Sequence, residues 1–228
     1  MLAAEASTTD PAWASFVRSA ETLAPSPGGR EAWTRGRRTY VVWALRLQSP
    51  EVEARVASVR ERLAFAGLDE KPELHVTVWV AGFPRSGGPR PSDDLVDDFV
   101  DDDVDPRVLH AQRSVQRLHR RVPLLVGGAS SFLSCATLAV HDVSGALARL
   151  RADLDAAAAP LGARELRFAT YTPHVTCGGY TRTSPTHRIA DALAPMRELS
   201  PLGVSGTLAC LAFDARVPGA PLRPWRSR

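Results

Sequence analysis

The chain has little cysteine and no long apolar run, and both absences narrow its class. Its three cysteines are Cys135, Cys177 and Cys210, an odd number without CxxC spacing, so neither a disulfide framework nor a zinc knuckle is indicated. No stretch approaches the ~20 apolar residues that a membrane helix requires. The first residues lack the basic start and apolar run of a signal peptide. We therefore expect a soluble cytoplasmic protein with no membrane partner.

Charge is also low. The 228 residues carry a net charge of +3, and 44% of them are apolar, an ordinary share for a globular protein. The basic residues are scattered, which is typical of a solvated surface. A mildly basic chain is compatible with an anionic substrate but does not establish one. The length suits one large domain or one domain of two halves.

The most informative feature is a tripeptide that occurs twice, as His75-Val76-Thr77 and as His174-Val175-Thr176. Side chains i and i+2 of a strand lie on the same face. Each copy can therefore present a histidine and a hydroxyl together, with the valine turned toward a core. A single His-x-Thr occurs by chance in many chains, whereas two identical copies at matching places favour a functional site.

The elements around the two copies follow the same order. Residues 40–47 are predicted to form a strand, Ser49 and Pro50 to begin a helix, and residues 74–80 to form the strand of the first copy. In the second half a strand at 136–141 precedes a helix capped by Ser144 and the strand of the second copy. The pattern indicates an internal duplication.

We expect an α+β fold of two pseudo-symmetric halves, each an antiparallel sheet with helices, around a central groove. Residues 1–38 are predicted to be a partly helical or flexible extension, 39–214 the bilobal domain and 215–228 a tail. Further elements are expected as helices at 12–23, from Pro106 and from Pro185, and as strands at 124–126 and 204–213. The two tripeptides would then meet near the axis between the halves.

Paired histidines and threonines suit acid–base chemistry on a phosphodiester. A neutral imidazole accepts a proton from water or a hydroxyl, and a charged one donates a proton to the leaving oxygen. The threonine hydroxyls can donate hydrogen bonds to the non-bridging oxygens. Such a reaction needs neither metal nor cofactor. Because the halves are alike, the sequence does not say which histidine is the acid.

The paired HxT motifs, the half-repeat and Ser131-Phe132 after Gly127-Gly128 resemble the 2H phosphoesterase superfamily, over about residues 39–214. The branch it is most similar to is that of the bacterial 2′-5′ RNA ligase (LigT-like) and RNA 2′,3′-cyclic phosphodiesterase proteins. The resemblance implies His75 and His174 as catalytic residues, with Thr77 and Thr176 as phosphate-binding residues. It also implies RNA ends or nucleotides with a cyclic phosphate or a 2′-5′ linkage as substrates.

Alternation along each strand extends the groove face to further candidates for substrate binding. They are Trp79, Tyr180, Gly178, Tyr171 and Phe83. The aromatic rings could stack on a base or pack against a loop, and the glycine could leave space for a ligand or form a bulge. Four arginines could hold a phosphate, and the sequence does not choose among Arg46, Arg85, Arg167 and Arg182.

Three alternatives stay open. The protein could bind an RNA end without turnover, it could be a reversible 2′-5′ RNA ligase, or the repeat could be accidental in an unrelated α+β protein. Eight aspartates within residues 93–105 are interpreted as a solvated helix face rather than a metal site. We expect a monomer.

Overall fold

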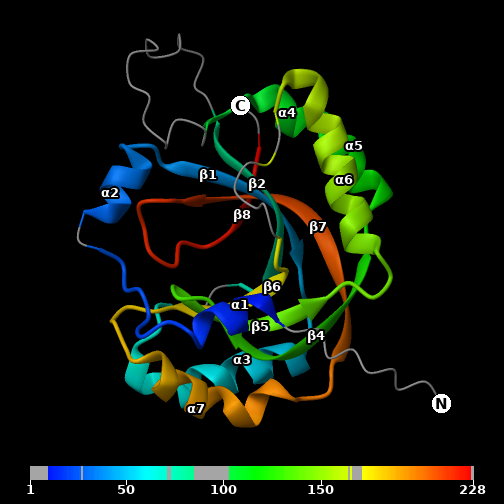
Figure 1. Ribbon diagram of the computed structural model, residues 1–228. Helices are drawn as coiled ribbons and strands as arrows, with labels where there is room; N and C mark the ends of the chain where they lie inside the picture. Colours follow the sequence, from blue (N-terminus) through cyan, green and yellow to red (C-terminus); the bar gives the residue numbers. More distant parts are fainter. Residues whose placement is uncertain are drawn as a thin grey trace, which may run out of the picture.

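The computed structural model of the protein describes residues 10–26, 28–70, 73–84, 103–163, 165 and 171–226 (Figure 1). Its elements in chain order are α1 (Pro11–Phe16), α2 (Gly29–Thr34), β1 (Thr39–Arg46), α3 (Pro50–Arg62), η1 (Ala64–Ala66), β2 (His75–Pro84), β3 (Asp103–Val104), α4 (Pro106–Ala111), α5 (Arg113–Leu118), β4 (Val122–Ser131), β5 (Cys135–His141), α6 (Ala146–Ala158), η3 (Ala159–Leu161), β6 (His174–Gly179), α7 (Thr186–Arg197), β7 (Leu202–Asp214) and β8 (Arg223–Pro224).

The strands form one sheet in the order β3-β2-β1-β7-β4-β5-β6, with β8 on β7. Every described pair is antiparallel except β2 with the two-residue β3. The long strand β7 belongs to both halves, because residues 202–206 pair with β4 and residues 207–214 pair with β1. The order β2-β1-β7-β4-β5-β6 is symmetric about its middle. The outer strands β2 and β6 are equivalent, as are β1 and β5 next to them and β7 and β4 at the centre. This confirms the α+β fold of two related antiparallel halves.

Helix α3 forms where the sequence predicts it. The Ser49 hydroxyl accepts a hydrogen bond from the Val52 amide at 3.3 Å, and Pro50 occupies the first turn. The apolar positions Val52, Val56 and Val59 are buried. Helix α6 buries the predicted leucine stripe but starts after Ser144, and Asp142 accepts a hydrogen bond from the Ala148 amide in its first turn.

The two crossover helices are exchanged between the halves. Helix α3 connects β1 to β2 but contacts β5, β6 and α7, while α6 connects β5 to β6 and contacts β2 and β4. Figure 1 shows α3 and α7 together on the side of β4 and β5, and α4, α5 and α6 together beside β7. Each half therefore supplies a helix that helps to cover the strands of the other half.

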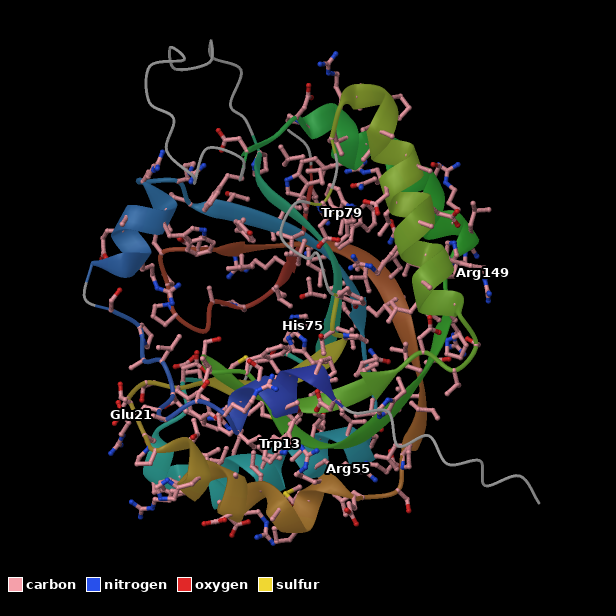
Figure 2. All side chains as sticks on the ribbon, in the orientation of Figure 1. Trp13, Glu21, Arg55, His75, Trp79 and Arg149 are labelled. Atoms are coloured by element: carbon pink, nitrogen blue, oxygen red, sulfur yellow. The ribbon has the colours of Figure 1, made fainter. Side chains whose placement is uncertain are left out.

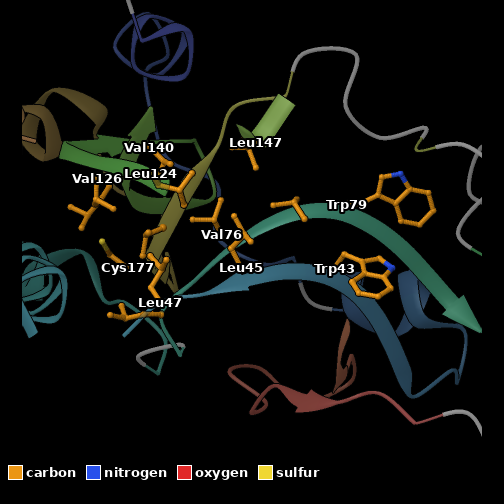
Figure 3. Close-up of a cluster of buried hydrophobic side chains, with 14 of the residues drawn as sticks. Trp43, Leu45, Leu47, Val76, Trp79, Leu124, Val126, Val140, Leu147 and Cys177 are labelled. Atoms are coloured by element: carbon orange, nitrogen blue, oxygen red, sulfur yellow. The ribbon is translucent and has the colours of Figure 1, made fainter. Parts of the chain in front are cut away.

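The main core lies between the sheet and these helices. Figure 3 shows part of this core, with Trp43 and Trp79 next to each other on the paired strands β1 and β2. Both indoles bury a polar N–H that is satisfied: Trp43 donates to Gln112 at 2.7 Å and Trp79 donates to Asp155 at 2.6 Å. A smaller cluster around Tyr40 packs on the other face of β1, beneath α2.

Several elements differ in extent from the prediction. The helix expected over 12–23 is only α1, the helix from Pro106 is divided into α4 and α5, and the strand at 124–126 extends over ten residues as β4. Most of the aspartate-rich run lies outside the described residues. Asp105 caps α4, and Asp103 forms an ion pair with Arg37. Among the described helices, none is long and apolar enough to cross a membrane.

Candidate active site

The two tripeptides begin the strands β2 and β6, and their burial follows the predicted alternation. Val76 and Val175 are fully buried, whereas the histidine and threonine on either side of each valine are half-buried. Each motif therefore presents one imidazole and one hydroxyl on the face of the sheet opposite its valine.

The two imidazoles are held in the same way. Nδ1 of His75 hydrogen-bonds the Glu73 carbonyl at 2.7 Å, and Nδ1 of His174 hydrogen-bonds the Thr172 carbonyl at 2.9 Å. A carbonyl only accepts, so Nδ1 carries the proton in both rings, and the neutral tautomer leaves its lone pair on Nε2. Among the described residues, neither Nε2 nor the hydroxyl of Thr77 or Thr176 has a hydrogen-bond partner. Four polar atoms are thus available to a ligand.

The motifs lie next to one another in space although 99 residues separate them. Strands β2 and β6 are in contact without sharing backbone hydrogen bonds. The hydroxyl of Tyr171, three residues before His174, donates a hydrogen bond to the Thr77 carbonyl at 2.8 Å. His75 lies near the middle of the molecule, between the two halves (Figure 2).

Burial lowers the pKa of both histidines below the usual value. For His75 the main cause is desolvation, which the carbonyl and carboxylate of Glu73 partly oppose. For His174 it is again desolvation, opposed by the Thr172 carbonyl and reinforced by the positive charge of His75. The second effect means that a proton on one ring disfavours a proton on the other. A state in which both rings are positively charged is therefore disfavoured.

A β-bulge follows the threonine in both motifs. In β2, Thr77 pairs with Ala44 and Trp79 pairs with Trp43, which leaves Val78 as the extra residue. In β6, Thr176 pairs with Thr137 and Gly178 pairs with Ala136, which leaves Cys177 as the extra residue. The two bulges occupy equivalent positions, so the duplication extends to an irregularity of the backbone.

The bulges correct three predictions of orientation. A bulge breaks the alternation, so Trp79, Gly178 and Tyr180 lie on the core side instead of beside the histidines. Trp79 is 2% exposed, and Tyr180 is 1% exposed with its hydroxyl hydrogen-bonded to Ser131 at 2.7 Å. A Cβ at Gly178 would lie 2.7 Å from Nη1 of Arg60, so this glycine makes room for a protein side chain.

The remaining two candidates differ in position. Tyr171 lies at the site, because its hydroxyl contacts the Thr77 carbonyl and its ring lines a cavity beside His174. Burial raises its pKa, so it remains a neutral phenol. Phe83 is buried in the smaller cluster, where its ring contacts Tyr40 and lies under the Arg37 guanidinium. The placement of Phe83 therefore contradicts its prediction as a groove residue.

An arginine from each exchanged helix binds the bulge of the opposite half. Nη1 of Arg151 in α6 donates to the Val78 carbonyl at 2.7 Å, and Nη1 of Arg60 in α3 donates to the Cys177 carbonyl at 2.7 Å. Both carbonyls come directly after the threonine of a motif. We call these two contacts the arginine clamps.

A carboxylate completes each arginine clamp three residues beyond the threonine. Oε1 of Glu165 accepts from the Val80 amide at 3.1 Å, and Oδ1 of Asp69 accepts from the Gly179 amide at 2.8 Å. Glu165 also lies 3.1 Å from Arg151 in a largely buried ion pair. Burial raises the pKa of Glu165, and Arg151 opposes that rise. No local sequence pattern marks these residues, because their partners are distant along the chain.

Two of the four candidate phosphate arginines fall within the described residues. Arg46 pairs in register with His75 and forms an exposed ion pair with Glu73 at 3.1 Å. Arg182 is exposed beside Gly67. Arg85 and Arg167 lie outside the described residues. Within the part of the chain that the structure describes, no three His, Cys, Asp or Glu side chains are grouped as metal ligands.

The family model of the 2′-5′ RNA ligase superfamily matches residues 48–212. Solved structures similar to the chain include Escherichia coli LigT in its apo form (14% identity, TM-score 0.49, covering 84% of this chain and 96% of that one) and LigT complexed with 3′-AMP (15%, 0.49, 83% and 95%). A structure described as a phosphoesterase is 16% identical, with a TM-score of 0.44 and coverage of 82% and 96%. The curated proteins give no match. Because the family model spans more than half of the chain and contains both motifs, the chain belongs to the 2′-5′ RNA ligase superfamily.

Proposed function

We propose that the protein is a metal-independent phosphodiesterase that acts on RNA ends or nucleotides bearing a 2′,3′-cyclic phosphate or a 2′-5′ linkage. The observation that carries the proposal is the equivalence of His75 and His174. Both rings use Nδ1 to bind the carbonyl two residues earlier, and both leave Nε2 without a partner among the described residues. Two such groups on contacting strands match the need for one base and one acid.

The reaction is an in-line displacement at phosphorus. Nε2 of the neutral histidine takes a proton from water as the water oxygen bonds to phosphorus. Nε2–H of the charged histidine gives its proton to the ribose oxygen as the P–O bond to that oxygen breaks. The carbonyl at Nδ1 holds each ring in place and stabilises the imidazolium that forms on the base. One proton enters the pair and one leaves, so the enzyme returns to its starting state after a proton is exchanged with water.

The threonines bind the phosphate. Thr77 and Thr176 each have a half-buried hydroxyl one strand position beyond the buried valine, on the face of the histidine. Each hydroxyl can donate to a non-bridging oxygen, where negative charge accumulates in the transition state. The arginine clamps contribute indirectly, because they fix the backbone immediately after each threonine.

The test is hydrolysis of nucleoside 2′,3′-cyclic monophosphates in excess EDTA. We expect turnover by the wild type and a loss of about 10²–10⁴-fold in kcat for His75→Ala and for His174→Ala, because each removes one proton-transfer group. The control is His187→Ala, which removes an exposed histidine of α7 and should leave the rate unchanged. Retention of activity in either motif variant would exclude the two-histidine mechanism.

The same assay separates the alternatives. Tight binding of the cyclic nucleotide without product would identify a binding module. Net joining of 2′,3′-cyclic phosphate and 5′-hydroxyl ends into a 2′-5′ linkage would identify a ligase. Loss of wild-type turnover in EDTA that is restored by a divalent cation would contradict the metal-independent mechanism.

A further inference from the structure

A cavity of about 150 Å³ opens directly beside His174. Its floor is formed by β5, where Ala139 pairs with His174 and Thr137 pairs with Thr176. Its walls are Phe132 at the end of β4, Tyr171 before β6, and the first residues of α1. Figure 1 shows α1 lying across β5. The cavity therefore adjoins the imidazole of the second motif.

The cavity breaks the symmetry between the two halves. In the first half the position equivalent to Ala139 is Arg46, which pairs with His75 and carries a long side chain bound to Glu73. The small side chain of Ala139 leaves open the space beside His174. A substrate in the groove thus meets a recess on the side of His174 and an ion pair on the side of His75.

The lining suits a flat, uncharged ring better than a second phosphate. Phe132 makes an edge-on contact with His174, with ring centroids 4.8 Å apart, and Tyr171 adds a second aromatic wall. Asp10 places a carboxylate at the rim, which repels a phosphate but accepts hydrogen bonds from N–H groups. The first amides of α1 are not available to an anion, because Oδ1 of Asp10 already accepts from Ala12 and Trp13.

The wall formed by α1 is fixed in place. Oδ2 of Asp10 accepts a hydrogen bond from the Ser130 hydroxyl at 2.5 Å, and Phe16 is fully buried in the main core. The guanidinium of Arg197 lies 3.8 Å from the centre of the Trp13 ring. The family match begins at residue 48, so this wall belongs to a segment that the family model does not include.

We infer that the cavity, called here the α1 pocket, binds the nucleobase of the nucleotide whose phosphate lies between the two histidines. The inference rests on the proposed function and assigns to the segment around α1 the recognition of the base. The base packs against the rings of Phe132 and Tyr171, and Oδ2 of Asp10, which accepts one hydrogen bond from Ser130, accepts a second from an amino or imino N–H of the base. Residues before the family match would then determine affinity for the nucleoside rather than the chemistry at phosphorus.

A variant that fills the α1 pocket from its rim tests the inference. Ala12→Trp places a large side chain in the α1 pocket without changing a histidine or threonine of the motifs. We expect KM for nucleoside 2′,3′-cyclic monophosphates to rise about tenfold or more, because base stacking is lost. The rate with glycerol 1,2-cyclic phosphate, which has no base, should stay within about twofold of the wild type on the same grounds.

The matched control is Ser15→Trp, which adds the same side chain at an exposed position of α1 and should change neither substrate. An equal effect of Ala12→Trp on both substrates, or on neither, would overturn the inference. If the wild type turns over neither substrate, the proposed function fails, and equilibrium binding of nucleoside 3′-monophosphates against glycerol phosphate then tests the pocket. The inference would be overturned if the wild type bound nucleoside 3′-monophosphates no more tightly than glycerol phosphate. It would also be overturned if Ala12→Trp left the affinity for the nucleotides unchanged.

Discussion

Within the described residues each imidazole of the paired motifs makes a single hydrogen bond, and that bond leaves Nε2 as the nitrogen for the proposed proton transfer. The sequence predicted that the histidine and threonine of each motif share a face, because alternation over three residues needs only a regular strand start. It did not predict the tautomer, because the acceptor is a backbone carbonyl, that of Glu73 or Thr172, and carries no side-chain signature. The symmetry of the two contacts leaves the acid and base roles to be set by the substrate.

The pH dependence of activity follows from the lowered pKa of both histidines. The proposed mechanism requires one neutral and one charged ring, and the charge of His75 lowers the pKa of His174 further. We expect a bell-shaped profile of kcat/KM with its maximum on the acid side of the ordinary histidine value of about 6.5. The quantity to measure is kcat/KM in excess EDTA, because it reports the free enzyme. A rate that rises to a plateau at alkaline pH would contradict the need for a charged histidine.

At the scale of elements, the bulges after Thr77 and Thr176 explain why the prediction of the groove face failed beyond the motifs. Period-2 alternation placed Trp79 and Tyr180 beside the histidines, but one extra residue in each strand turns both into the core. The bulge in β2 has no sequence mark, because Val78 is an ordinary strand residue, whereas the bulge in β6 lies beside Gly178, for which a bulge was one of the two expectations. They are stabilised by arginines from α6 and α3, which the sequence could not assign to the opposite half.

The clamp of the first motif can be tested at Arg151, which binds the Val78 carbonyl, Glu165 and the face of Tyr171. Arg151→Met should destabilise the protein by about 3–5 kcal/mol, because it leaves the buried Glu165 without its partner. It should also lower kcat more than it raises KM, since it frees the backbone beside Thr77. Urea unfolding and steady-state kinetics measure the two effects.

Arg149→Met is the matched control for this prediction. Arg149 is exposed on the same helix (Figure 2), so its replacement should change stability and activity little. Arg151→Met,Glu165→Gln removes both charges and should recover part of the stability while kcat stays low. If the double variant recovers kcat fully, Arg151 has no positioning role at the motif.

At the scale of the whole molecule, the repeat in the sequence predicted two related halves but not how they are joined. The sharing of β7 between β1 and β4 follows from its length of 13 residues, which the pattern around residues 204–213 underestimated. The exchange of α3 and α6 leaves no trace in the periodicity, because a helix buries the same apolar stripe against either half. The wall provided by α1 was equally hidden, since it depends on contacts of Asp10 and Phe16 with residues more than a hundred positions away or in the common core.

Because β7 is shared and α3 and α6 are exchanged, we predict that the two halves unfold together. Leu150 is fully buried in α6, a helix of the second half that contacts β2 of the first half. Leu150→Ala should lower the free energy of unfolding by about 2–5 kcal/mol, through lost burial and a cavity. Urea unfolding followed by far-ultraviolet circular dichroism and by tryptophan fluorescence should give one coincident transition in the wild type and in the variant. Trp43 and Trp79 lie in the first half, so the fluorescence is sensitive to its unfolding. If the circular dichroism of the variant changes at a lower urea concentration than its fluorescence, the halves are independent folding units. Coincident shifts would instead mean that the groove and both motifs exist only when the whole sheet is formed.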